Sequence, residues 1–139
     1  MRVQDILAKK GSAVLTLPSS APVAELLATL ADNQVGAVVI IEDDQVVGIA
    51  SERDVVRHLR DGAANDTPVS ALMTTEVVSC CLADEIQSLA ETMTNKRFRH
   101  LPVVEEGRLV GIVSIGDVVK NRLDELTNER DHLSNYLHG

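Results

Sequence analysis

The chain has 139 residues, of which 45% are hydrophobic, and a formal net charge of −8 at pH 7. That hydrophobic content excludes intrinsic disorder, and the negative charge argues against general binding to nucleic acid, which depends on neutralising phosphates. No apolar run approaches the roughly 20 residues of a membrane span, and the first residues lack the apolar stretch of a secretory signal. We therefore expect a soluble, cytoplasmic protein that binds neither nucleic acid nor a membrane.

Repetition dominates the sequence, because the pattern of the first half recurs 63 positions later. The corresponding pairs include Gly48 and Gly111, Ser51 and Ser114, and Asp54 and Asp117. Before residue 14 the offset grows to 66, because the first copy carries a short insertion around the segment KKGS. We predict repeat 1 at residues 1–62, a linker at 63–68, repeat 2 at 69–124 and a C-terminal helical extension at 125–139.

The first half of each repeat predicts a short strand followed by a helix. In repeat 1 the strand is expected at 13–17, and the helix is capped by Ser20 with Pro22 in its first turn. In repeat 2 the strand is expected at 77–82, and Asp84 caps the helix. Both helices carry an apolar stripe at helical spacing.

The second half of each repeat predicts a β-hairpin and a second, shorter helix. The hairpin turns are expected at 42–45 and 105–108, between β-branched runs. These runs are apolar without alternation, so both faces of the strands should be covered. One repeat of about 60 residues is marginal alone, so we expect the two repeats to share a core.

A long helix is predicted beyond Leu123, with apolar residues spaced three and four apart. Its apolar seam consists of Val119, Leu123, Leu126, Leu133 and Leu137, with Arg130 at the one polar position. Packing against its own repeat and packing against a partner subunit are both compatible with this pattern.

The two cysteines, Cys80 and Cys81, are neighbours in the sequence. A disulfide between adjacent residues is strained, so we interpret both as small apolar residues of a buried strand. A redox role is the alternative. No metal site is predicted, because the histidines stand at no recognisable ligand spacing from Cys or Asp.

The repeated motif Gly-x-x-Ser-x-x-Asp lies where a strand gives way to a helix. Ser51 and Ser114 are expected at the N-cap, with Asp54 and Asp117 at the third helical position of a capping box. The same groups suit a nucleotide, because a carboxylate accepts from ribose hydroxyls and a helix N-terminus favours an anion. Capping and ligand binding are both compatible with the motif.

The two motif copies are in register, the segment RHLPVV occupies 99–104, and each repeat has the order β-α-β-β-α. In these features the sequence resembles a tandem pair of cystathionine β-synthase (CBS) domains, or Bateman module. The resemblance covers about residues 3–123. It implies an α/β (α+β) fold of two repeats packed with pseudo-twofold symmetry. It also implies two clefts between the repeats, each able to hold an adenosine-containing ligand.

The resemblance assigns roles within these clefts. It implies that the two aspartates of the motif hold ribose hydroxyls and that the two serines lie near sugar or phosphate. Segment 16–18 would border the base in the first cleft, and segment 79–81, which lacks the proline, in the second. The ligand-binding residues it implies are Thr16, Leu17, Pro18, Ser51, Arg53, Asp54, Ser79, Arg99, His100, Pro102, Ser114 and Asp117.

Basic residues are distributed unequally between the copies. Arg99 and His100 stand where repeat 1 has Gly36 and Ala37, and the resemblance implies that they face phosphates. Arg53 is matched by a glycine in repeat 2. We therefore expect two clefts that are not equivalent.

These observations predict a stand-alone regulatory module for signal transduction, with AMP, ADP, ATP or NAD as regulatory ligand rather than catalytic cofactor. We expect a disc-shaped homodimer that signals to an effector protein on another chain. No enzymatic activity is predicted, because the chain has no phosphate-cradling loop ending in Lys-Ser/Thr and no recognisable nucleophile with its base. The alternative is an interaction scaffold whose ligand sites are vestigial.

Overall fold

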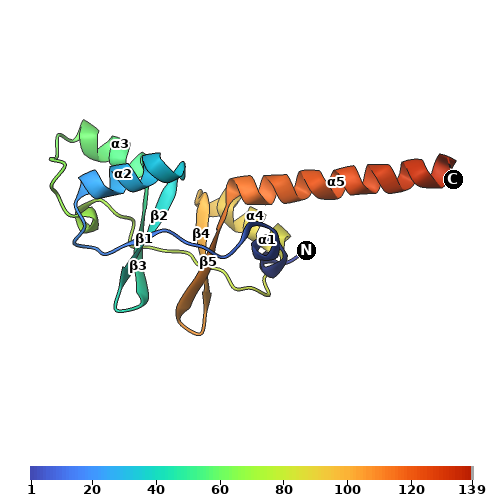
Figure 1. Cartoon of the computed structure of the whole chain (residues 1–139), viewed down its shortest axis with the longest axis horizontal. Coiled ribbons are helices and arrows are strands. Elements are labelled where there is room, and N and C mark those ends of the chain that lie inside the picture. Colours follow the sequence, from blue (N-terminus) through green and yellow to red (C-terminus); the bar gives the residue numbers. More distant parts are fainter. Residues whose placement is uncertain (139) are drawn as a thin grey trace.

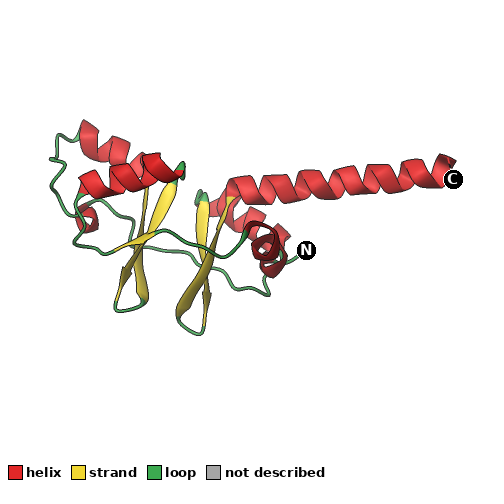
Figure 2. Ribbon diagram, in the orientation of Figure 1, coloured by secondary structure: helices red, strands yellow, loops and turns green. Residues whose placement is uncertain are grey.

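The computed structural model describes residues 1–138, and within them two similar α+β units lie side by side (Figures 1 and 2). In repeat 1 the elements are α1 (Val3–Lys10), β1 (Thr16–Leu17), α2 (Val23–Asn33), β2 (Ala37–Glu42), β3 (Gln45–Ser51) and α3 (Glu52–Arg60). In repeat 2 they are the 3-10 turn η1 (Val69–Ala71), α4 (Ile86–Lys96), β4 (His100–Glu105), β5 (Arg108–Ser114) and α5 (Ile115–His138). The predicted fold class is confirmed.

The two hairpins have the same register, so the sequence repeat is also a structural repeat. Ala37 lies opposite Ser51 in the β2–β3 pair, and His100 lies opposite Ser114 in the β4–β5 pair. Each pair has one register shift, at corresponding positions. Each predicted turn has two residues of positive φ, the geometry that matches the twist of a two-residue hairpin.

The strand that opens each repeat is much shorter than predicted. The expected strand at 13–17 contracts to Thr16–Leu17, which pairs in parallel with β2, and the one at 77–82 contracts to a single bridge from Cys80 to Val103. Only Leu17 and Cys80 of these segments are buried. Each segment therefore contributes one core residue rather than a full strand.

Side chains do not cap α2 and α4, contrary to the predictions for Ser20 and Asp84. The N-cap positions are Pro22 and Glu85, and neither makes a side-chain capping hydrogen bond. Backbone carbonyls of segments distant in the sequence accept from the first amides instead: Thr67 O from Val23 N, and Met1 O from Ile86 N. The chain that leads into each repeat performs this function for the other repeat.

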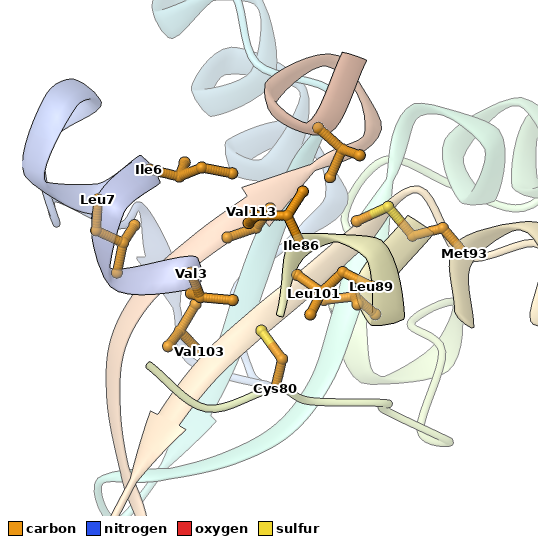
Figure 3. Packing of buried hydrophobic residues seen from close by; sticks show 11 residues of the cluster. Val3, Ile6, Leu7, Cys80, Ile86, Leu89, Met93, Leu101, Val103 and Val113 are labelled. Carbon is orange, nitrogen blue, oxygen red and sulfur yellow. The ribbon is translucent and has the colours of Figure 1, made fainter. Parts of the chain in front are cut away.

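The protein has two hydrophobic clusters rather than the single shared core we predicted. One cluster joins α1 to repeat 2, and Figure 3 shows Val3, Ile6 and Leu7 of α1 directed towards the strands and α4 of that repeat. The other cluster joins Val69 of η1 to repeat 1. The segments that precede the repeats are thus exchanged, and each core is completed by chain from outside its own repeat.

Matching backbone hydrogen bonds fix both exchanged segments. Val3 N donates to Asp84 O at 3.0 Å, and Val69 N donates to Ala21 O at 2.8 Å. A second bond follows one residue later in each segment, to the carbonyls of Leu82 and Ser19. The exchange is therefore a repeated feature with a fixed register.

Glycine allows the exchanged segments to approach the sheets. A Cβ added at Gly111 would lie 2.7 Å from Cδ1 of Leu7, and one added at Gly48 would lie 2.6 Å from Sδ of Met73. The Gly48 position is also restricted by a backbone atom, because Thr74 O would lie 3.0 Å away. This close approach explains why both copies of the motif begin with glycine.

The last helix continues without a break from the second motif to His138, and it leaves the two repeats (Figure 1). Its seam is open to solvent: Leu123 is 59% exposed, Leu126 45% and Leu133 61%. The alternative in which this seam packs against its own repeat is therefore wrong. None of the helices described between residues 1 and 138 is both long and apolar enough to cross a membrane.

Gly111→Ala should lower the free energy of unfolding by about 1–3 kcal/mol, because the new methyl group overpacks the contact with Leu7. Leu7→Ala should partly rescue this loss in the double mutant, so the two changes should be non-additive in denaturant unfolding. Met73→Ala should restore less of the stability lost in Gly48→Ala, because the new methyl group still lies close to the backbone carbonyl of Thr74. Strictly additive effects of Gly111→Ala and Leu7→Ala would contradict the close approach.

Candidate functional site

The first motif forms the predicted capping box at the N-terminus of α3. Ser51 N donates to Asp54 Oδ2 at 2.9 Å, and Asp54 N donates to Ser51 Oγ at 3.4 Å. The Ser51 hydroxyl also donates to Asp54 Oδ2 at 3.1 Å. The aspartate is only 7% exposed. Within residues 1–138 no hydrogen bond reaches its other oxygen, Oδ1, so capping leaves one carboxylate oxygen for a ligand.

The second motif repeats this geometry at the N-terminus of α5. Ser114 N donates to Asp117 Oδ2 at 2.9 Å, and Asp117 N donates to Ser114 Oγ at 3.1 Å. This carboxylate has an additional partner, because Lys10 Nζ donates to Asp117 Oδ2 at 2.6 Å. The two motifs are alike in backbone geometry and differ in charge environment.

A cavity of about 350 Å³ lies between the repeats beside the first motif. Repeat 1 and the following segment supply Gly36, Ala37, Ile49, Ser51, Glu52, Arg53, Asp54, Arg57 and Thr74, and repeat 2 supplies Arg97, Phe98, Arg99 and His100. The cavity thus brings together five of the predicted residues: Ser51, Arg53, Asp54, Arg99 and His100. Its walls combine one buried carboxylate with four guanidinium groups.

Sequence reasoning missed two of these arginines. Arg57 lies four residues after Arg53, on the same face of α3, a spacing that could have indicated it. Arg97 closes α4 in the left-handed region, with φ 59°, where its counterpart in repeat 1 is Gln34 with φ 54°. Its nearness to Arg99 in the segment RFRH was the available signal.

Thr74 reaches the cavity through the exchanged segment, and no local motif indicated it. Its backbone pairs with Ile49 of β3 at 2.9 and 3.0 Å. The wall of the cavity therefore includes a stretch of chain that belongs to the approach to repeat 2.

The predicted base-contacting residues do not line this cavity. Thr16, Pro18 and Ser79 are exposed, Leu17 is part of the core of repeat 1, and Pro102 is fully buried in β4. Their proposed contacts with a ligand stay predictions.

A second cavity of about 380 Å³ adjoins the first along α3. The two cavities share Asp54 and Arg57. The second is also lined by His58, whose Nε2 lies 3.1 Å from the carbonyl oxygen of Ala64. A ligand longer than the first cavity could therefore extend past the carboxylate towards the linker.

His100 lies close to charged groups of both motifs. Burial lowers the pKa of its imidazole, and the cations of Lys10 and Arg99 act in the same direction. Asp117 and Glu52 oppose this, but the net pKa is below the ordinary 6.5. The ring lies over Gly36, where an added Cβ would be 3.4 Å from Cε1. The imidazole is thus held mostly neutral at pH 7 in the ligand-free chain.

The carboxyl of Asp117 has the opposite balance. Partial burial raises its pKa, but the hydrogen bonds from Lys10 and Ser114 and the positive charge of Lys10 outweigh burial. The net pKa is below the ordinary 3.8. The carboxylate and the ammonium are therefore both ionised at neutral pH.

The cysteines lie in different environments, in contrast to the prediction that both are buried. Cys80 is buried and Cys81 is exposed, and both are free thiols. Burial raises the pKa of Cys80 to about 12, with Asp84 and Cys81 contributing in the same direction. Only Cys81 is accessible for the alternative redox role.

Comparison with known proteins identifies both repeats. The family model for the CBS domain matches residues 3–61 and 69–124. The chain is 35% identical over 108 residues to the uncharacterized protein MJ1225 of Methanocaldococcus jannaschii, covering 77% of this chain but only 39% of that longer protein.

Solved structures have the same arrangement. The CBS-domain containing protein ATU1752 from Agrobacterium tumefaciens is 43% identical, with a TM-score of 0.84 over 88% of this chain and 99% of that one. The CBS domain protein PAE2072 from Pyrobaculum aerophilum, whose structure is complexed with AMP, is 29% identical, with a TM-score of 0.77 over 84% and 89% of the two chains.

The environment of His100 predicts a pH-dependent contribution to stability. Its pKa is lowered in the folded chain, so below about pH 6.5 the unfolded chain binds more protons, and the folded state loses stability as the pH falls. His100→Gln should reduce this loss. Denaturant unfolding between pH 7.5 and 5 measures the difference between wild type and variant.

The control is His132→Gln, which replaces an exposed histidine of α5. It should leave the pH dependence of stability unchanged. Equal pH profiles for wild type and His100→Gln would contradict the lowered pKa of His100.

Proposed function

The chain belongs to the CBS domain family and carries the domain twice. From that premise we propose that it is a regulatory, signal-transduction protein that binds adenosine-containing ligands in clefts between its repeats. The proposed ligands are AMP, ADP, ATP or NAD, bound as regulatory ligands and not used in catalysis. The bound state is passed to an effector protein, which requires that the ligand bind two arrangements of the chain with different affinity.

The observation that carries this proposal is the composition of the first cavity. One wall presents the free carboxylate oxygen of Asp54, which suits the hydroxyls of a ribose. The opposite repeat contributes Arg97 and Arg99, whose guanidinium groups suit phosphate oxygens. A volume of about 350 Å³ is within the range of small-molecule sites.

The relatives favour the same ligand class. PAE2072, which has 29% identity to this chain, has a structure complexed with AMP. Adenosine is common to all four proposed ligands, and the adjoining second cavity offers room for the larger ones. The free thiols are typical of a reducing compartment, so we place the protein in the cytoplasm.

We also propose that the chain forms a homodimer through the exposed seam of α5. The seam residues have the three-and-four spacing of a two-helix coiled coil, with Arg130 as one polar member. In a parallel pair of α5 helices, Glu129 of one copy would lie beside Arg130 of the other, so a second copy of the chain offers charge complementarity at the one polar position.

Asp54→Ala should weaken AMP binding at the first cleft by about ten- to a hundred-fold, the loss of hydrogen bonds to a charged acceptor worth roughly 1.5–3 kcal/mol. Arg99→Ala should weaken AMP by a similar factor but adenosine much less, because its partner is the phosphate. Titration calorimetry with both ligands measures these differences.

A matched control is Arg108→Ala, an exposed arginine at the opposite end of the same hairpin, which should change neither affinity. Equal losses for AMP and adenosine in Arg99→Ala would remove its phosphate role. Absence of binding heat from wild type with AMP, ADP, ATP and NAD would favour the interaction scaffold with vestigial sites.

Replacing Leu126 and Leu133 together by Gln should convert the proposed dimer to a monomer, because both apolar residues lie at the centre of the seam. Sedimentation or light scattering gives the mass in solution. Asn128→Gln with Asn135→Gln is the control, since these polar residues have the same seven-residue spacing off the seam. A dimer mass that survives the leucine replacements would show that α5 is not the interface.

A further inference from the structure

The carboxylates of the two motifs have different partners in the ligand-free chain. Asp54 is bonded only to Ser51 of its own motif among the described residues. Asp117 is bonded to Ser114 in the same way and is also held by Lys10, with Nζ 2.6 Å from Oδ2. The side chains of this ion pair are 33% and 22% exposed, so both ends are partly shielded from water.

Lys10 reaches Asp117 because α1 is fixed in the core of repeat 2. Leu7 packs over Gly111, and Lys10, the last residue of the helix, follows one turn later on the same side. The corresponding segment that leads into repeat 2 forms only the three-residue turn η1. Residues 67–79 contain no Lys or Arg, so nothing equivalent to Lys10 approaches Asp54.

The facing repeat brings no cation to the second motif, in contrast to the first. The positions in repeat 1 that correspond to Arg97, Arg99 and His100 are Gln34, Gly36 and Ala37. The position in α5 that corresponds to Arg53 is Gly116, and only Arg57 has a cationic counterpart, Lys120. Arg99 and His100 also lie next to the second motif, since Arg99 O accepts from Ile115 N and His100 lies opposite Ser114, but Lys10 is the cation bonded to Asp117 itself.

We propose that Lys10 is the specificity-determining residue of the second cleft and that it selects ligands carrying a phosphate next to the ribose. The inference rests on the proposed function, because it takes Asp117 as the acceptor of ribose hydroxyls. In the ligand-free chain the ammonium is bonded to Oδ2 of that carboxylate and offsets its charge, so the carboxylate is a weaker acceptor for a ribose. A nucleotide also offers the ammonium a phosphate, whereas a neutral nucleoside offers it no anionic partner.

The chemistry sets the direction of each effect. Breaking a partly exposed ion pair costs a ligand about two- to fivefold in affinity. A new charge-assisted hydrogen bond to phosphate returns about ten- to a hundred-fold. Removing the ammonium should therefore raise the affinity for adenosine slightly and lower the affinity for AMP strongly. A purely structural role of Lys10 would instead lower both affinities.

The test isolates the second cleft in Asp54→Ala protein and titrates it with AMP and with adenosine. Adding Lys10→Met should weaken AMP by about ten- to a hundred-fold and strengthen adenosine by about two- to fivefold. Lys10→Arg should keep the preference for AMP. Lys9→Met removes a neighbouring exposed charge of α1 and should change neither affinity.

Equal changes for the two ligands, or no change, in Lys10→Met would overturn the assignment. A second outcome is that wild type binds AMP but the Asp54→Ala protein, shown to be folded by circular dichroism, does not. The second cleft then does not bind AMP, which overturns the assignment and leaves the proposed function intact. Wild type that binds neither ligand overturns both. If Asp54→Ala does not fold, AMP is titrated into wild type and into Lys10→Met, and the affinities of the first and second bound AMP are compared. The assignment requires that Lys10→Met weaken only the second AMP.

Discussion

The exchange of leading segments between the repeats is the constraint on which the rest of the structure depends. A repeat of about 60 residues buries too little surface to be stable alone. Here each core is completed by apolar side chains from outside its repeat: Val3 and Leu7 of α1 in one, Val69 of η1 in the other. Gly48 and Gly111 favour this exchange, since a Cβ at either position would lie within 3.0 Å of a side chain of the exchanged segment. The two repeats therefore cannot be separated without losing core residues from both.

The same exchange determines where ligand chemistry is possible. Each exchanged segment ends beside a strand that leads into a motif helix. The wall of a cleft is therefore formed by residues from both repeats. Thr74 joins the first cavity through its pairing with Ile49, and Arg97 and Arg99 enter it from the opposite repeat. Both repeats contribute side chains to one cavity, so a ligand bound there, as proposed, would contact groups of both. That is the geometric requirement for a regulatory module.

Sequence reasoning succeeded where the cause is local and failed where it is tertiary. The capping boxes at Ser51 and Ser114 follow from the order of residues at a strand-to-helix transition, so the repeat was sufficient to predict them. Pro22 was assigned to a helix start that Ser20 was expected to cap, but carbonyls from the linker accept those amides instead. The position of Thr74 also depends on how the chain between the repeats pairs with β3, which no local pattern encodes. The resemblance supplied the pairing of the repeats but not the exchange.

A three-residue difference between the copies explains why two sites of one design diverge. Both leading segments begin with the same backbone bonds, at Val3 and Val69, but the first is longer by the insertion around KKGS. The added length lets α1 complete two turns and end on Lys10, next to Asp117, whereas η1 stops after one turn and brings no charge to Asp54. The first site therefore has cations from α3 and from the facing repeat, whereas the carboxylate of the second is bonded to the ammonium of the exchanged segment. The two motifs therefore keep the same backbone geometry while their carboxylates have different partners.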